Sequence, residues 1–287
     1  MMTVHAPTTA ALNTTWQNAP THTIKAGGVE FAYRRLGQTT GVPVVFLTHL
    51  AAVLDNWDPR VVDGIAAKHR IIVFDNRGVG ASSGATPRTI EEMARDAVAF
   101  IRAIGFDQVD LFGFSMGGMI AQVIAQQHPQ LVRKMIIAGT GPAGGEGIDK
   151  VTRITYLDTA RGLLTRQDPK QLVFFTSTPN GRRAGKEFLA RLEERTNDRD
   201  KAISVRSFRA QLKAIHRWGQ HKPADLASIH QPVLLLNGDS DKMVPTRNTI
   251  DLGRRLPNSQ LVIYPDAGHG GVFQFHQDFV KRALEFL

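Results

Sequence analysis

Residues 109–121 place a serine between a strand-type run and a helix-type run. The apolar run ends at Gly113, the helix-forming run starts directly after Ser115, and Gly117 follows. This G-x-S-x-G pattern is typical of a sharp, strained turn, because its glycines leave the backbone nearly free of side chains. Such a turn exposes the serine hydroxyl at a helix N-terminus, where backbone N–H groups favour a developing negative charge. The pattern therefore predicts Ser115 as a catalytic nucleophile.

A second match to the same pattern occurs at residues 80–84, around Ser82. A random chain of this length contains one match roughly one time in ten, so context has to separate the two serines. Ser82 lies in a polar loop several residues beyond its strand, and no helix starts at it. Ser115 has a strand directly before it and a helix directly after it. We therefore interpret Ser82 as a loop serine.

Strand-type runs alternate with helical patterns along most of the chain, which is typical of βαβ units and a parallel sheet. The predicted strands are a hairpin at 23–36, which turns at Gly27-Gly28, and runs at 42–47, 70–74, 109–113, 134–138, 233–236 and 260–264. The predicted helices are 58–67, 89–104, 116–128, 246–256 and 275–287. We expect an α/β fold with a mostly parallel, eight-stranded sheet flanked by helices.

The alternation breaks at the glycine-rich stretch 139–147 and resumes at Pro232. The residues between them show helical periodicity and no convincing strand, with apolar residues at roughly helical spacing at Ile203, Phe208, Leu212 and Ile215. We expect four parts: a flexible N-terminal arm at 1–21, a first core segment at 22–140, an all-helical cap at 141–228 and a second core segment at 229–287.

A serine hydroxyl needs a base to take its proton and a carboxylate to orient that base. In this topology both partners follow later strands, in the order serine, acid, histidine. His269 follows strand 260–264 between two glycines, so we expect it to be the base. Asp241 is the favoured acid, because Met243-Val244, Pro245 and a helix come after it. Two other aspartates remain open: Asp239, a turn former by its position, and Asp266, on the histidine loop.

Composition narrows the classes of partner. The chain has 287 residues, no cysteine and a net charge of +9. Residues 150–225 hold 17 Lys and Arg against 8 Asp and Glu and so account for that charge. Acidic residues are interleaved and no nucleic-acid or metal motif is present, so we expect solvated helices and neither a nucleic-acid partner nor a metal. The absence of cysteine, of a signal-like start and of a long apolar run predicts a cytoplasmic protein without a membrane partner.

Four motifs in this order resemble the α/β-hydrolase superfamily, in its branch of cofactor-free haloperoxidases (perhydrolases), enol-lactonases and small carboxylesterases. They are Gly113-Phe114-Ser115-Met116-Gly117-Gly118, the loop 75–82, the segment 238–245 and Gly268-His269-Gly270. The resemblance covers roughly residues 23–287 and matches 141–228 with a cap domain. It implies Ser115, Asp241 and His269 as the catalytic triad, with no cofactor.

The resemblance also implies an oxyanion hole formed by the backbone N–H groups of Ala51 and Met116. The usual His-Gly-x segment reads His49-Leu50-Ala51 here, so a leucine stands at the glycine position. A side chain there restricts the backbone and narrows the cleft. Leu50, Trp57 and Phe114 are expected to contact substrate, with core packing as the alternative for Trp57. Apolar residues of the cap are expected to line the pocket or form the cap's own core: Leu163, Leu164, Phe174, Phe175 and Phe188.

These residues favour a serine hydrolase that cleaves a small ester or lactone through an acyl-enzyme. Two alternatives use the same triad: perhydrolysis, in which hydrogen peroxide captures the acyl-enzyme, and carbon–carbon bond hydrolysis. A third alternative is a non-catalytic binding protein on the same scaffold, for which a complete triad has no purpose. Dehalogenase and epoxide hydrolase chemistry is excluded by the serine at the turn, because those enzymes attack with a carboxylate.

Overall fold

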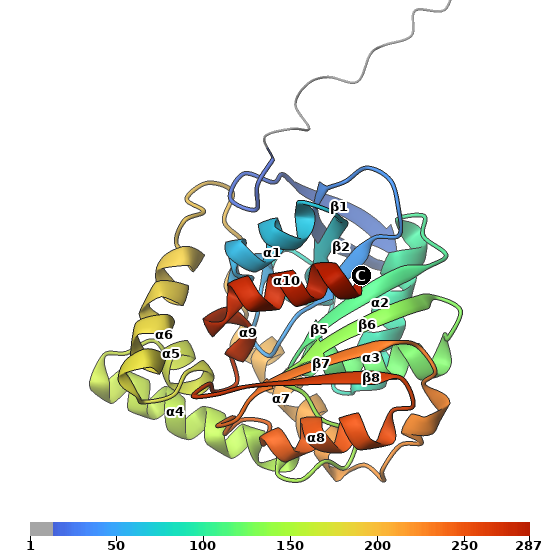
Figure 1. Cartoon of the computed structure of the whole chain (residues 1–287). Coiled ribbons are helices and arrows are strands. Elements are labelled where there is room, and N and C mark those ends of the chain that lie inside the picture. The colour runs from blue at the N-terminus through green and yellow to red at the C-terminus, as the bar shows by residue number, and fades with distance from the viewer. Residues whose placement is uncertain (1–13) are drawn as a thin grey trace, which may run out of the picture.

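The computed structural model describes residues 14–287, which form one eight-stranded sheet with helices on both faces (Figure 1). The strands are β1 (Thr21–Ala26), β2 (Val29–Gly37), β3 (Val44–Leu47), β4 (Arg70–Phe74), β5 (Val109–Phe114), β6 (Val132–Ala138), β7 (Val233–Gly238) and β8 (Ser259–Tyr264). Their order in the sheet is β1-β2-β4-β3-β5-β6-β7-β8. β2 is antiparallel to both its neighbours, and all pairs from β4 to β8 are parallel. The predicted fold class is confirmed.

Both faces of the sheet are apolar, because side chains alternate between the faces along each strand. Phe46 and Phe112 pack on one face, with α1 (Pro59–Ala66), α9 (Gly271–Gln274) and α10 (His276–Phe286). Leu47 and Leu111 pack on the other, with α2 (Ile90–Ala103), α3 (Met116–Gln127) and α8 (Thr246–Arg255). Ser115, between β5 and α3, therefore lies at the carboxyl end of a central strand.

The helix predicted at 275–287 is present as α10, and the short helix α9, which was not predicted, precedes it. Phe275 leaves helical geometry, with φ −106° and ψ 38°, and separates α9 from α10. Its ring stacks on that of Tyr264, with centroids 4.8 Å apart. This stacking couples the helix junction to the end of β8, directly before the loop that carries His269.

Between β6 and β7 the chain forms α4 (Val151–Thr165), α5 (Pro169–Phe174), α6 (Pro179–Leu192) and α7 (Val205–Gln220). All residues of this stretch are described, and none of them forms a strand. Figure 1 shows α4, α5 and α6 projecting to one side of the sheet. We refer to α4–α7 with their connections as the helical insertion.

Residues 14–21 do not fit the flexible arm that was predicted for 1–21. Trp16 is buried, and its backbone N–H donates to Asp63 Oδ1 at 2.7 Å. Arg195 Nη1, from the helical insertion, donates to the carbonyl oxygens of Trp16 and Ala19 at 3.1 and 3.0 Å. No local pattern indicates these bonds, because the arginine lies far away along the chain. The rest of the predicted arm, residues 1–13, lies outside the described residues.

Candidate active site

The turn at Ser115 has the strained geometry that its glycines predict. Ser115 has φ 55° and ψ −114°, a backbone region that non-glycine residues rarely adopt. A Cβ on Gly117 would lie 1.9 Å from the Leu47 carbonyl oxygen, and one on Gly113 would lie 2.4 Å from the Gly117 oxygen. Side chains at these two positions would therefore push α3 away from the sheet.

The structure brings Ser115, His269 and Asp241 together. His269 Nε2 lies 2.8 Å from Ser115 Oγ, and His269 Nδ1 lies 2.7 Å from Asp241 Oδ2. A carboxylate only accepts hydrogen bonds, so the proton of the neutral imidazole is on Nδ1 and points at Asp241. Nε2 is then free to accept the Ser115 hydroxyl proton. This is the geometry that a serine nucleophile and its base require.

The surroundings of the three candidate acids differ. Asp241 Oδ1 accepts from the N–H groups of Met243 and Val244 at 2.8 and 3.0 Å, which leaves Oδ2 for His269. Asp239 accepts from the N–H groups of the histidine loop, among them that of Asp266 at 3.1 Å. The Asp266 carboxylate accepts from threonine hydroxyls of the helical insertion. Of the three carboxylates, it is that of Asp241 that contacts the imidazole.

The second G-x-S-x-G serine has a structural setting. Ser82 Oγ donates to the Asp75 carbonyl oxygen at 2.8 Å and accepts from the Ala32 N–H at 2.9 Å. The first bond lies within the loop after β4, and the second joins this loop to β2. Ser82 thus uses its hydroxyl to hold the loop in place, as expected of a loop serine.

The two predicted oxyanion donors have different partners. Met116 is the first residue of α3, so its N–H has no acceptor within the helix. The Ala51 N–H instead donates to Gln211 Oε1 of α7 at 2.8 Å. Ala51 also has φ 64°, a strained value for alanine. Gln211 was not predicted to be a site residue, and its only sequence signal is a polar side chain within the apolar spacing of Phe208, Leu212 and Ile215.

A cavity of about 530 Å³ opens above Ser115 and His269. Its apolar wall comes from the loop after β3, from the helical insertion and from the Asp241 loop, with Leu50, Val173, Phe174, Phe208, Ile215 and Met243 among the lining residues. Asp55, Asn56, Arg199 and Asp200 supply polar groups. This size and lining suit a small organic molecule.

Several residues that were expected at the cavity lie elsewhere. Trp57 is fully buried against Phe46 and Phe112, so the core-packing alternative holds for it. Phe114 is also buried, and its ring packs beside the His269 imidazole at 5.0 Å. Phe114 points into the core from β5, Trp57 packs there from the loop after β3, and neither side chain lines the cavity.

Two leucines of α4 were expected to line the pocket or to pack in the core of the cap, and they do neither. Leu163 and Leu164 are 78% and 86% exposed and do not line the cavity. Phe174 does line it, whereas Phe175 and Phe188 pack in the core beneath. Helical periodicity alone does not say which face of an inserted helix meets the rest of the molecule.

His49 lines the cavity as a neutral imidazole. Burial is the main cause that lowers its pKa to about 3. Its Nδ1–H donates to the Leu50 carbonyl oxygen at 2.8 Å, and its Nε2 has no partner among the described residues. The ring therefore carries no positive charge beside His269 at neutral pH.

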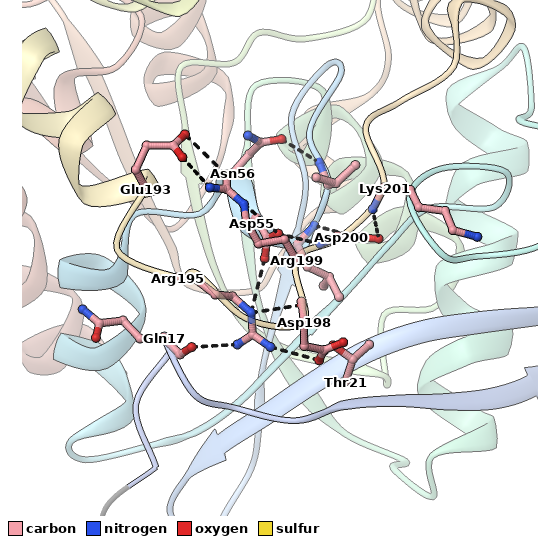
Figure 2. A network of polar contacts seen from close by, with 12 residues as sticks. Gln17, Thr21, Asp55, Asn56, Glu193, Arg195, Asp198, Arg199, Asp200 and Lys201 are labelled. Atoms are coloured by element: carbon pink, nitrogen blue, oxygen red, sulfur yellow. Dashed lines mark hydrogen bonds and ion pairs between the residues drawn. The ribbon is translucent and has the colours of Figure 1, made fainter.

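A charged network fastens the helical insertion to the loop after β3 (Figure 2). Asp55 pairs with Arg34 at 2.5 Å and lies 3.7 Å from Arg195 and 3.9 Å from Arg199. The backbone N–H of Asp200 donates to Asp55 Oδ2 at 2.6 Å. Figure 2 shows Arg195 and Arg199 reaching Asp55 from the segment after α6. The helical insertion thus holds the loop after β3 at two residues, at Asp55 through this network and at Ala51 through Gln211.

Within residues 14–287, no group of three or more His, Cys, Asp or Glu side chains is placed to hold a metal ion. The same part of the chain has no helix long and apolar enough to cross a membrane.

Comparison with known proteins agrees with this geometry. The family model described as alpha/beta hydrolase fold matches residues 42–275. The chain belongs to this family. It is similar to an alpha/beta hydrolase fold protein from Chitinophaga pinensis, with 38% identity, 95% and 98% of the two chains covered and a TM-score of 0.90.

Two further similarities fall in the branch that the motifs indicated. One is with the putative non-heme bromoperoxidase BpoC of Mycobacterium tuberculosis, 28% identical over 86% of this chain and 94% of that protein. The other is with the structure described as Est816, an N-acyl homoserine lactone degrading enzyme. It has 25% identity, a TM-score of 0.74, and coverage of 93% and 100% of the two chains. The predicted resemblance is confirmed.

Proposed function

We propose that this protein is a serine hydrolase that cleaves small esters or lactones through an acyl-enzyme. The observation that carries the proposal is the pair of contacts of His269, with Ser115 Oγ at 2.8 Å and Asp241 at 2.7 Å. Ser115 attacks the carbonyl carbon, and its hydroxyl proton moves to His269 Nε2. Asp241 holds the imidazole and stabilises its positive charge.

The tetrahedral intermediate places a negative charge on the former carbonyl oxygen. The Met116 N–H, at the N-terminus of α3, is one donor for this oxygen, and the Ala51 N–H is the second once it is released from Gln211. His269 then returns its proton to the leaving alcohol, the acyl group stays on Ser115, and a water activated by His269 cleaves the acyl-enzyme.

The substrate class follows from the cavity and from the relatives' names. An apolar wall with a few polar groups suits the acyl chain of an ester or the ring of a lactone. One relative is named a lactone-degrading enzyme and another a putative bromoperoxidase. Because water and hydrogen peroxide attack the same acyl-enzyme, the two activities differ in the second nucleophile. A bromination assay with acetate and peroxide separates them.

Replacing Ser115 tests the proposal. Ser115→Ala should abolish hydrolysis of p-nitrophenyl acetate and labelling by a fluorophosphonate probe, because both reactions need the hydroxyl. Ser82→Ala, the matched serine of the second G-x-S-x-G match, should keep both. Labelling and turnover that persist in folded Ser115→Ala protein would exclude the proposed mechanism.

A further inference from the structure

The Ala51 N–H has a partner before any substrate arrives. It donates to Gln211 Oε1 at 2.8 Å, so a neutral amide oxygen occupies one of the two proposed oxyanion donors. Ala51 holds this position with φ 64°, a left-handed conformation that is unfavourable for an alanine. The resting loop is therefore strained and already hydrogen-bonded.

Gln211 reaches this position from the cavity side of α7. Phe208 and Ile215, three residues before it and four after it on the helix, both line the cavity with Ser115. Residues at this spacing share one face of a helix. Gln211 is fully buried behind them, whereas Ala51 lines the cavity, so a ligand in the cavity competes with Gln211 for the Ala51 N–H.

The side-chain amide of Gln211 has a hydrogen-bond partner at only one of its two ends. Its Oε1 must face Ala51, because a backbone N–H only donates. Its Nε2 is buried and has no partner among residues 14–287. A buried donor without a partner destabilises the arrangement that holds it. The unpaired Nε2 therefore lowers the cost of releasing Gln211 when a better acceptor for the Ala51 N–H appears.

We infer that Gln211 is a gate on the oxyanion hole: it occupies the Ala51 N–H at rest and yields it to the substrate's carbonyl oxygen. The inference rests on the hydrolase function proposed above. The exchange breaks one hydrogen bond and forms another, and no proton changes owner. It is favourable in the tetrahedral intermediate, since a charged acceptor holds an N–H roughly twice as strongly as a neutral one. Gln211 is thus a positioning residue.

The gate has a consequence for specificity. Substrate binding energy has to displace Gln211, and a longer acyl chain has more of it, because it contacts Phe208 and Ile215. An acetyl group contacts less of α7. The gate therefore favours esters with longer acyl chains over acetate esters.

Gln211→Met tests this directly, because methionine has a similar size and no oxygen to accept from Ala51. We expect kcat/KM for p-nitrophenyl acetate to rise about two- to tenfold. The gain for p-nitrophenyl hexanoate should be smaller, and phenylboronic acid, whose serine adduct places an oxygen in the oxyanion hole, should bind more tightly. Gln220→Met makes the same change on an exposed part of α7 and should alter none of these values. A folded Gln211→Met protein with unchanged or lower activity would overturn the gate.

Gln211→Glu gives the opposite change and decides the question if the methionine variant does not fold. A carboxylate binds the Ala51 N–H more strongly and repels the oxyanion, so activity should fall. The ratio of its kcat/KM to that of the wild type should recover as the pH is lowered and the introduced carboxylate is protonated. A pH-independent ratio contradicts the gate. Fluorophosphonate labelling of the wild type separates the two proposals. If the wild type is not labelled, the proposed hydrolase function is wrong. If it is labelled, the results with the Gln211 variants test the gate alone.

Discussion

His269 has two aspartates on the neighbouring loop, and their hydrogen bonds separate their roles. Asp241 is fixed by the N–H groups of Met243 and Val244 and contacts the imidazole. Asp239 instead supports the backbone of the histidine loop. Both carboxylates accept hydrogen bonds from backbone N–H groups, but only Asp241 has an oxygen that faces the His269 imidazole.

Asp241→Asn should lower kcat for ester hydrolysis by about 10³- to 10⁴-fold, because an amide that donates to His269 imposes the wrong tautomer. Asp239→Asn keeps one acceptor oxygen for the loop and should retain most of the activity. Initial rates with p-nitrophenyl acetate measure both variants. Equal losses would show that Asp241 has no special role.

Among the elements, the turn at Ser115 brings α3 into close contact with β3. The backbone of α3 passes so near to Leu47 that only glycine fits at position 117. This contact fixes the direction of α3 and, with it, the position of the Met116 N–H. The nucleophile and one oxyanion donor are therefore set by the same strand–helix junction.

Gly117→Ala should reduce the free energy of unfolding by about 1–3 kcal/mol, because the new methyl group collides with the Leu47 carbonyl. Gly253→Ala, on α8, is the matched control. Its Cβ would find its nearest neighbour at 3.5 Å, an ordinary contact, and the change should stabilise the helix by up to about 1 kcal/mol. Urea unfolding measures both. A stable Gly117→Ala protein would argue against the close junction.

In the whole molecule, buried polar groups join the helical insertion to the loops at the edge of the sheet. The Leu54 N–H is shared by Asp75 Oδ1 of the core at 3.0 Å and Asp200 Oδ2 of the insertion at 3.4 Å. Burial, followed by the hydrogen bond to Asp200, raises the pKa of Asp75 well above its usual value. The raised pKa favours a proton on Asp75 where the insertion meets the loop of Ala51.

This proton predicts a pH dependence of stability. Above the ordinary pKa of 3.8 the unfolded chain loses the Asp75 proton while the folded protein keeps it. The contribution of Asp75 to the free energy of unfolding therefore falls as pH rises, until the raised pKa is passed. Asp75→Asn cannot titrate, and its amide donates to Asp200, so its stability should depend less on pH. Urea unfolding at a series of pH values from about pH 4 upward compares the two proteins. Equal slopes would contradict the raised pKa of Asp75.

The strands, the turn at Ser115 and the loop of His269 are predictable from the sequence, because they depend on local signals. Alternating apolar runs and the glycines beside Ser115 and His269 lie within short stretches, and the chain order of the three triad residues follows from the order of the strands. The resemblance added the family, and comparison confirmed it.

Only the tertiary structure decided what the long-range contacts do. Whether Trp57 meets substrate depends on which face of the sheet it packs on, and no local pattern states that. The partners of Trp16 and Ala51, Arg195 and Gln211, come from distant parts of the helical insertion. Such contacts depend on how the insertion docks on the sheet, and its docking is fixed by buried charges whose partners the sequence does not pair.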